Sequence, residues 1–355
     1  MRLNAEGAAA SRVLKERRET IAQRVTGLYF EARPDLEQRW KGARQRCTED
    51  NRFHLDYLCE ALSFGQPALF TEYAGWAAAL LARLNIPCEA LAFNLLLLRT
   101  TLASELDGAG RALASRYLDA AIERIAGGVP ELPGHIAGTG PLDVLARDYL
   151  AYLLRGERHA ANRLILDAVD GGTSVRDIYL RVFQPVLHEV GRLWQSNRIG
   201  VAQEHYSTAC TQSIMSQLYP RIISAEKKGL RLVAACVGGD LHEIGARMVA
   251  DFFELEGWDT FFLGANTPIS GILQQVEERQ PHVLAISATM PFHVQAVADL
   301  IEATRAATRA APNPPRILVG GAPFNSLPGL WKDAGADGCA RDAADAIAVV
   351  GGWSV

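Results

Sequence analysis

The chain has no apolar run long enough to cross a bilayer and no strong excess of either charge. Its most apolar stretch, ALAFNLLLL, is interrupted by Asn94 and closed by Arg99, far short of the roughly 20 residues that a membrane helix needs. The N-terminal stretch MRLNAEGAAASRVLKERRET has no apolar core, so we expect no signal peptide. The net charge of −4 gives no basic field for nucleic acid. These absences predict a cytoplasmic protein that binds neither membranes nor nucleic acid directly.

The chain also lacks closely spaced cysteines. None of its 6 cysteines forms a CxxC pair, which argues against a zinc cluster and against a disulfide framework. What is present is the composition of an ordinary globular protein, with 49% hydrophobic and 21% charged residues in 355. That length allows two or three domains.

Residues 1–128 predict an all-helical sensor domain, for which a globin-like fold is one option. Apolar residues recur at helical spacing over 53–65, 67–87 and 88–108, and glycine or proline separates these segments. Residues 129–141 are rich in glycine and proline and predict a linker.

Residues 142–226 predict a four-helix bundle, because four apolar-periodic segments follow one another with short breaks. Pro185 lies inside the third segment, where we expect a kink. Residues 227–355 change pattern. Short apolar runs alternate with helical segments there, which predicts a Rossmann-like or flavodoxin-like sheet of five parallel strands. The fold class is therefore multi-domain, α followed by α/β.

A histidine stands where the first run of this sheet gives way to a helix, in GGDLHEIG. Ligands of such sheets bind at the carboxyl ends of the strands. Asp240 is close enough in sequence to hydrogen-bond one nitrogen of His242, which leaves the other nitrogen free for a metal. Gly245 lets a bulky group approach the helix. A histidine that merely caps the helix is the structural alternative.

Two further loops meet the same edge of the predicted sheet. Ser287 and Thr289 follow the third strand, and Gly320 and Gly321 follow the fourth, where missing side chains leave room between strands. Three loops with matching features favour a ligand site over chance.

D-L-H-E-I-G, then Ser287-x-Thr289, then Gly320-Gly321, resembles the cobalamin-binding domain of methionine synthase, the mutases and the corrinoid proteins. The resemblance covers residues 230–355. It implies that His242 is the lower axial cobalt ligand and Asp240 its hydrogen-bond partner. It also implies a channel for the displaced nucleotide tail, lined by Gly245, Ser287, Thr289, Gly320 and Gly321.

The bundle adds a second pattern, Trp194 followed by Glu204 and His205. A tryptophan that closes the bundle end, with a glutamate at a helix N-terminus, is the structural alternative. Together the residues resemble the light-sensing MerR-type B12-dependent repressors. The resemblance implies that Trp194 and Glu204 contact the adenosyl group of adenosylcobalamin and that His205 lies nearby. Those repressors have a histidine after the tryptophan, whereas this chain has Gln195.

The N-terminal domain resembles, more loosely, that of photocobilins, which implies biliverdin as a second chromophore. Arginines near residues 39–52 suit its propionates, and aromatic residues suit a flat tetrapyrrole. A solvated basic face with an ordinary aromatic core, a haem site at His54 and a ligand-free domain are the alternatives.

The resemblances together favour a photoreceptor that is not an enzyme. Light would cleave the cobalt–carbon bond and change the assembly of a dimer or tetramer, or the binding of a signalling partner. Two alternatives stay open: a corrinoid protein that carries methyl groups for a methyltransferase, and a B12-binding antirepressor of transcription.

Overall fold

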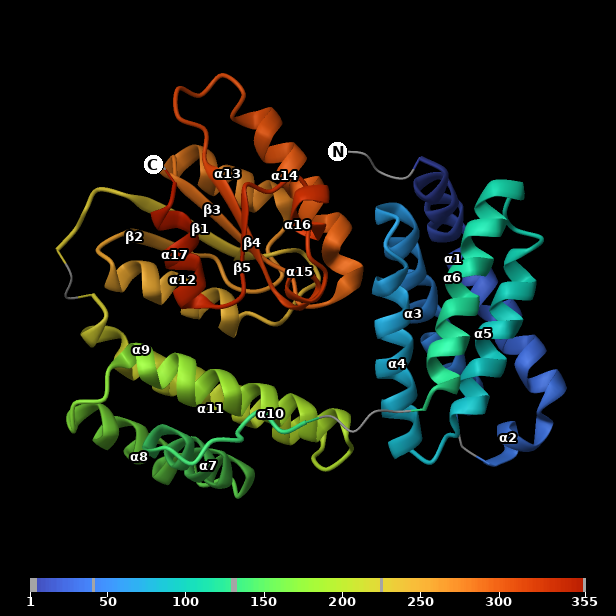
Figure 1. The fold of residues 1–355 in the computed structure, drawn as a ribbon, viewed down its shortest axis with the longest axis horizontal. Coiled ribbons are helices and arrows are strands. Elements are labelled where there is room, and N and C mark those ends of the chain that lie inside the picture. Colours follow the sequence, from blue (N-terminus) through green and yellow to red (C-terminus); the bar gives the residue numbers. More distant parts are fainter. Residues whose placement is uncertain (1–4, 40–41, 129–132, 224–225, 354–355) are drawn as a thin grey trace. The chain divides into compact units, whose positions relative to one another are not determined.

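The computed structural model describes residues 5–39, 42–128, 133–223 and 226–353. The chain divides into two compact units, Met1–Pro130 and Glu131–Val355, called unit 1 and unit 2 here (Figure 1). The division falls in the sequence predicted as the linker, of which residues 129–132 lie outside the described part.

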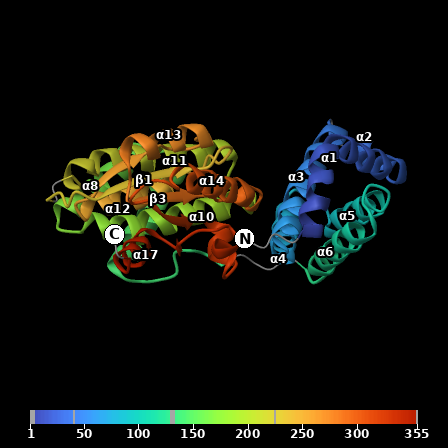
Figure 2. The same ribbon diagram turned by 90° about the horizontal axis from the view of Figure 1, so that it is seen from above.

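Unit 1 is helical throughout its described residues, as its sequence predicts. α1 packs along α3, and the two lie side by side in both views (Figures 1 and 2). Gly65 ends α3 in the left-handed region at φ 64°, and the Asp107 side chain caps α6 by accepting from the Gly110 N–H. The helices are α1 (Ala5–Ala32), α2 (Pro34–Arg39), α3 (Ala43–Phe64), α4 (Pro67–Arg83), α5 (Cys88–Leu102) and α6 (Gly108–Ala126).

Unit 2 begins with the helical bundle. The third predicted helix is divided, because Pro185 has no N–H to offer the Arg181 carbonyl and its ring crowds that turn. A π-helical segment, which the sequence did not predict, directly precedes it. The bundle comprises α7 (Pro141–Leu154), α8 (Arg158–Asp170), α9 (Val175–Asp177), the π segment η1 (Ile178–Phe183), α10 (Gln184–Gln195), α11 (Val201–Leu218) and the short turn η2 (Tyr219–Arg221).

The rest of unit 2 is a five-stranded parallel sheet in the order β2-β1-β3-β4-β5. β1 and β3 are almost wholly buried, which explains their continuous apolar sequences. The strands are β1 (Arg231–Cys236), β2 (Asp259–Phe262), β3 (Val283–Ser287), β4 (Arg316–Gly320) and β5 (Gly338–Ala340). The helices are α12 (Ile244–Leu255), α13 (Ile269–Arg279), η3 (Pro291–His293), α14 (Val294–Ala307), α15 (Ala322–Ser326), α16 (Leu330–Asp333) and α17 (Ala343–Gly351).

The bundle packs on the sheet through α12. Met248 and Phe252 of that helix belong to the same buried apolar cluster as the bundle core, and the Tyr179 hydroxyl donates to Asp251 Oδ2 at 2.8 Å. The chain reverses its winding between β1 and β3, which places the loops after those strands at the switch point of the sheet. In the described part of the chain, no helix is long and apolar enough to cross a membrane.

Candidate functional site

The loop between β1 and α12 carries the aspartate and histidine predicted from the sequence. Gly239 has φ +87°, a conformation that favours glycine, and it turns the chain so that the next residue faces inward. Asp240 is 1% exposed. A carboxylate buried to that degree needs hydrogen-bond donors.

Asp240 has those donors. Its Oδ1 accepts from the His242 backbone N–H at 3.0 Å and lies 2.8 Å from His242 Nδ1. Its Oδ2 accepts from the Thr289 backbone N–H at 2.5 Å. An ionised carboxylate only accepts, so Nδ1 of His242 carries the proton and Nε2 has a free lone pair.

Asp240 and His242 each stabilise the charged form of the other. Burial raises the pKa of Asp240, but the His242 and His293 side chains and the backbone N–H groups of His242 and Thr289 outweigh it and hold the pKa well below its ordinary value. The hydrogen bond to Asp240 raises the pKa of the His242 imidazole, burial lowers it, and the charges of Asp240 and Glu204 raise it further. Asp240 is therefore ionised at neutral pH and makes His242 a stronger electron-pair donor.

The His242 side chain is 58% exposed although its partner is buried. An accessible imidazole with a fixed tautomer can bind a metal through Nε2. No group of three or more His, Cys, Asp or Glu side chains in the described residues is placed to hold a bare metal ion. A metal that brings its own equatorial ligands, such as cobalt in a corrin ring, needs only one.

The predicted residues of the third and fourth loops lie at the same edge. Ser287 pairs in register with Cys236 on one side and with Gly320 on the other. Gly321 has φ +110°, and a Cβ there would lie 1.9 Å from the Ala288 carbonyl oxygen. The protein's own backbone thus requires glycine at 321.

Gly245 differs from Gly321, because an added Cβ would meet no atom within 4 Å. Nothing in the described protein requires glycine at this position of α12, so its missing side chain keeps open space beside the histidine loop. Together with the exposed imidazole, the exposed Gly245 leaves this edge of the sheet accessible to a bulky ligand.

The three bundle residues predicted from sequence lie at the adjoining ends of α10 and α11. Glu204 is in the first turn of α11, and its charge reaches His242. Its Oε2 lies 2.6 Å from His205 Nδ1, and its Oε1 accepts from the Thr208 hydroxyl at 2.9 Å. Trp194 is half-buried near the end of α10. Both contacts of Glu204 are within its own helix, as expected for a charge at a helix N-terminus.

Two contacts near His242 were missed by sequence reasoning. Glu243 accepts from Gln212 Nε2 of α11 at 2.6 Å and from the Ala265 N–H at 2.9 Å, and so joins the bundle to the ligand loop. His293, which follows β3, lies near Asp240. A lone histidine outside any motif gave no signal, whereas Glu243 lies inside the quoted motif and could have been noticed.

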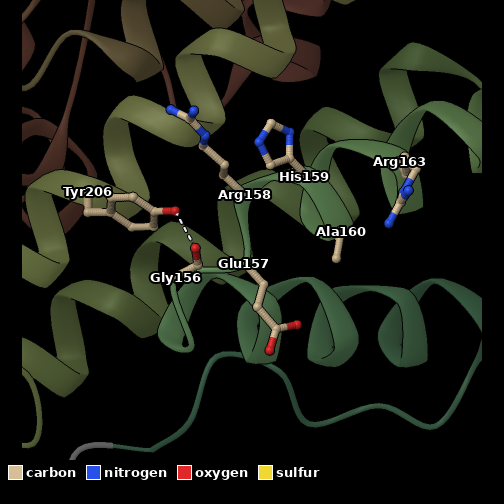
Figure 3. Close-up of a pocket in the computed structure, with 7 residues that line it drawn as sticks. All are labelled: Gly156, Glu157, Arg158, His159, Ala160, Arg163 and Tyr206. Carbon is tan, nitrogen blue, oxygen red and sulfur yellow. Dashed lines mark hydrogen bonds between the residues drawn. The ribbon is translucent and has the colours of Figure 1, made fainter.

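A separate hollow of about 460 Å³ lies where α7 turns into α8 (Figure 3). The Tyr206 hydroxyl donates to the Gly156 carbonyl at its edge. Its other lining residues are Glu157, Arg158, His159, Ala160 and Arg163. None of the residues predicted as a site lines it.

Three of the residues considered for biliverdin in unit 1 have partners within that unit. Arg52 is bound by Glu19 with both contacts at 2.8 Å. Tyr57 and Tyr73 stack on each other with ring centroids 3.6 Å apart. Trp40 and Lys41, from the predicted basic segment, lie outside the described residues.

Two family models, both described as a B12 binding domain, match this chain. One covers residues 230–350 and the other residues 145–219. Together with the relatives below, they show a cobalamin-binding protein, and the predicted helical and Rossmann-like fold is confirmed.

The relatives are corrinoid proteins. Dimethylamine corrinoid protein 3 of Methanosarcina acetivorans is 31% identical over 125 residues, which are 35% of this chain and 56% of that protein. Monomethylamine corrinoid protein 1 of Methanosarcina mazei is 27% identical over 194 residues, 53% of this chain and 87% of that protein. The chain thus spans little more than half the length of the dimethylamine corrinoid protein.

A solved structure shares the fold of unit 2. The monomethylamine corrinoid protein of Methanosarcina barkeri has a TM-score of 0.52 at 20% identity and covers 58% of this chain and 97% of its own.

The light-sensing function expected from the sequence is wrong, because these relatives are methylamine corrinoid proteins. The motif around His242 indicates the cofactor and not its use. The pattern of Trp194 and Glu204 favoured light sensing; in the structure the Glu204 carboxylate contacts His205 and Thr208 of α11, and its charge acts on His242. The comparisons do not support the adenosyl form, biliverdin or a photocobilin-like identity.

Proposed function

We propose that this cobalamin-binding chain is a corrinoid protein that carries a methyl group between partner methyltransferases. One observation carries the proposal: bundle and sheet together match corrinoid proteins named for methylamines, and an accessible imidazole backed by a buried carboxylate lies at the sheet edge. The chain would have no catalytic activity of its own, and its partners would supply the catalytic groups.

The residues of unit 2 would divide the work of holding the corrinoid. His242 would bind cobalt through Nε2, and Asp240 would hold the Nδ1–H tautomer and strengthen the donor. Gly245 would leave room for the cofactor, and Ser287 and Gly320, at the ends of β3 and β4, would border its nucleotide tail. Bound cobalamin would supply a cobalt centre that accepts and releases a methyl group.

The test uses the full-length protein loaded with cobalamin, reduced chemically and methylated with methyl iodide. Demethylation is then followed by absorption after adding a thiol acceptor with a cobalamin-dependent methyltransferase. We expect enzyme-dependent loss of the methyl–cobalt bands. The control variant is His159→Ala, which removes an exposed histidine of α8 away from the ligand loop.

The outcomes distinguish cobalamin binding from methyl transfer. His242→Ala should lose the transfer, and His159→Ala should keep it. A protein that binds methylcobalamin through His242 but is never demethylated by any methyltransferase tried would contradict the carrier function and leave cobalamin binding intact.

A further inference from the structure

His293 approaches Asp240 from the side opposite to His242. It ends the short turn η3, and its Nδ1 lies 3.6 Å from Asp240 Oδ2, whereas His242 contacts Oδ1. His293 is 7% exposed, and its Nδ1 is a buried atom with no hydrogen-bond partner in the described residues. A buried polar atom aimed at a ligand's carboxylate partner calls for a physical reason.

The packing around His293 holds the ring in place. A Cβ on Gly239 would lie 3.0 Å from His293 Nε2, so the bare glycine backbone is in close contact with that side of the ring. The Phe292 ring meets the imidazole edge to face, with centroids 4.4 Å apart. The loop that carries Asp240 therefore fits against this imidazole.

The chemistry of Asp240 Oδ2 and His293 Nδ1 determines which nitrogen of His293 carries the hydrogen. Asp240 Oδ2 is an acceptor, and a lone pair on His293 Nδ1 facing it would be repelled, so Nδ1 carries hydrogen. At 3.6 Å the contact is too long for a hydrogen bond. It acts as a charge–dipole attraction, which low interior polarity strengthens.

We propose that His293 is a positioning residue that tunes the cobalt ligand His242 through Asp240. Its N–H draws the negative charge of the carboxylate toward Oδ2, which makes Oδ1 a weaker acceptor for the His242 Nδ1–H. A weaker hydrogen bond there makes Nε2 a weaker donor. The inference depends on cobalamin binding and not on methyl transfer.

Two variants isolate the N–H group. His293→Leu has similar bulk without a donor, and His293→Asn places an amide nitrogen close to the position of Nδ1. The full-length protein is loaded with cobalamin, and the midpoint potential of the cob(II)alamin/cob(I)alamin couple is measured. Because cob(I)alamin binds an axial base poorly, stronger binding of His242 to cob(II)alamin lowers this potential.

We expect His293→Leu to strengthen that binding about tenfold, which is about 59 mV toward negative potential for one electron. His293→Asn should stay near the parent. A potential unchanged in the Leu variant, or shifted equally in both variants, would overturn the proposal.

A second measurement needs no cofactor. In the unloaded protein, nitrogen-15 NMR of the histidine rings reports the strength of the His242 Nδ1–H hydrogen bond. The Leu variant should move the His242 Nδ1 signal and the Asn variant should not. An unmoved signal in a folded Leu variant overturns the proposal even where the loaded variants bind no cobalamin.

Discussion

His54 in unit 1 and His242 in unit 2 both make a contact through Nδ1, to very different partners. His54 is 3% exposed and lies 2.7 Å from the Tyr73 hydroxyl, and burial lowers its pKa to about 4. His242 is 58% exposed and lies 2.8 Å from the buried Asp240, whose hydrogen bond raises its pKa.

The difference separates a packing histidine from a ligand histidine. Burial with a neutral partner keeps His54 uncharged and leaves its ring among aromatic neighbours. A buried carboxylate behind an accessible ring gives His242 a fixed tautomer and a basic nitrogen that faces outward. Either residue could look like a metal ligand in the sequence, and only the partner distinguishes them.

The largest expected effect is that of His242→Ala. Loss of hydrogen-bond partners behind a metal ligand costs about 10–100-fold in metal affinity, and loss of the ligand itself should cost at least that much. Cobalamin titration of the full-length protein, followed by absorption, measures it, with His159→Ala as the unchanged control. An affinity within twofold of the parent would show that His242 is not the cobalt ligand. An equal loss of affinity in His54→Asn would show that the two histidines do not differ in this role.

A pH effect should appear in unit 1. The folded pKa of His54 lies below its ordinary value, so its contribution to stability is complete above about pH 6.5 and is lost as pH falls through about 4. The shift corresponds to roughly 3 kcal/mol at most. Asp50, whose pKa burial raises to about 6, acts in the opposite direction.

Comparison with His54→Asn in the full-length chain isolates the histidine, because Asp50 is present in both. Hydrogen exchange of α3 peptides measures the local stability at each pH. The parent should lose more protection than the variant between pH 6.5 and 4. Parallel losses would mean that His54 does not titrate as its burial requires.

Gly245→Ala should weaken cobalamin binding without weakening the fold. An added methyl group meets no protein atom within 4 Å, and alanine suits a helix better than glycine, so the fold should be stabilised by up to about 1 kcal/mol. If the open space receives the corrin, cobalamin affinity should fall about tenfold, or about 1.4 kcal/mol. Unchanged affinity in this variant would show that the space beside His242 is not used.

The smallest effect should be that of Glu204→Gln. Its carboxylate interacts with His205 and Thr208 of its own helix, and a charge at a helix N-terminus contributes about 0.3–1 kcal/mol. Thermal unfolding should move little and cobalamin affinity less than about threefold. A large loss of affinity would show direct contact between Glu204 and the cofactor.

Much of the fold followed from the sequence because unit 2 has clear periodicity. β1 and β3 are buried on both faces, which gives them the short, continuous apolar runs from which the parallel sheet was predicted. The π-helical segment before Pro185 was not foreseen, because the sequence indicates a lost hydrogen bond there but not how the chain adjusts.

The sequence predicted the site residues that lie within one short motif, but not those brought to the site by folding. Asp240 and His242 are two residues apart, and their hydrogen bond follows from that spacing. His293 is more than fifty residues further on and joins Asp240 only through the packing of two loops. The use of the cofactor was predicted wrongly, since the residues that bind cobalamin do not specify the group it carries.

The most direct test of the account is whether a nitrogen of the protein binds cobalt. Full-length protein labelled with nitrogen-15 in histidine is loaded with unlabelled cobalamin, reduced to the cob(II)alamin state and measured by electron paramagnetic resonance. If His242 is the axial ligand, the triplet splitting seen in unlabelled protein becomes a doublet, and His242→Ala loses the doublet. A triplet that persists in the labelled protein would place the cofactor's own base on cobalt and contradict the account.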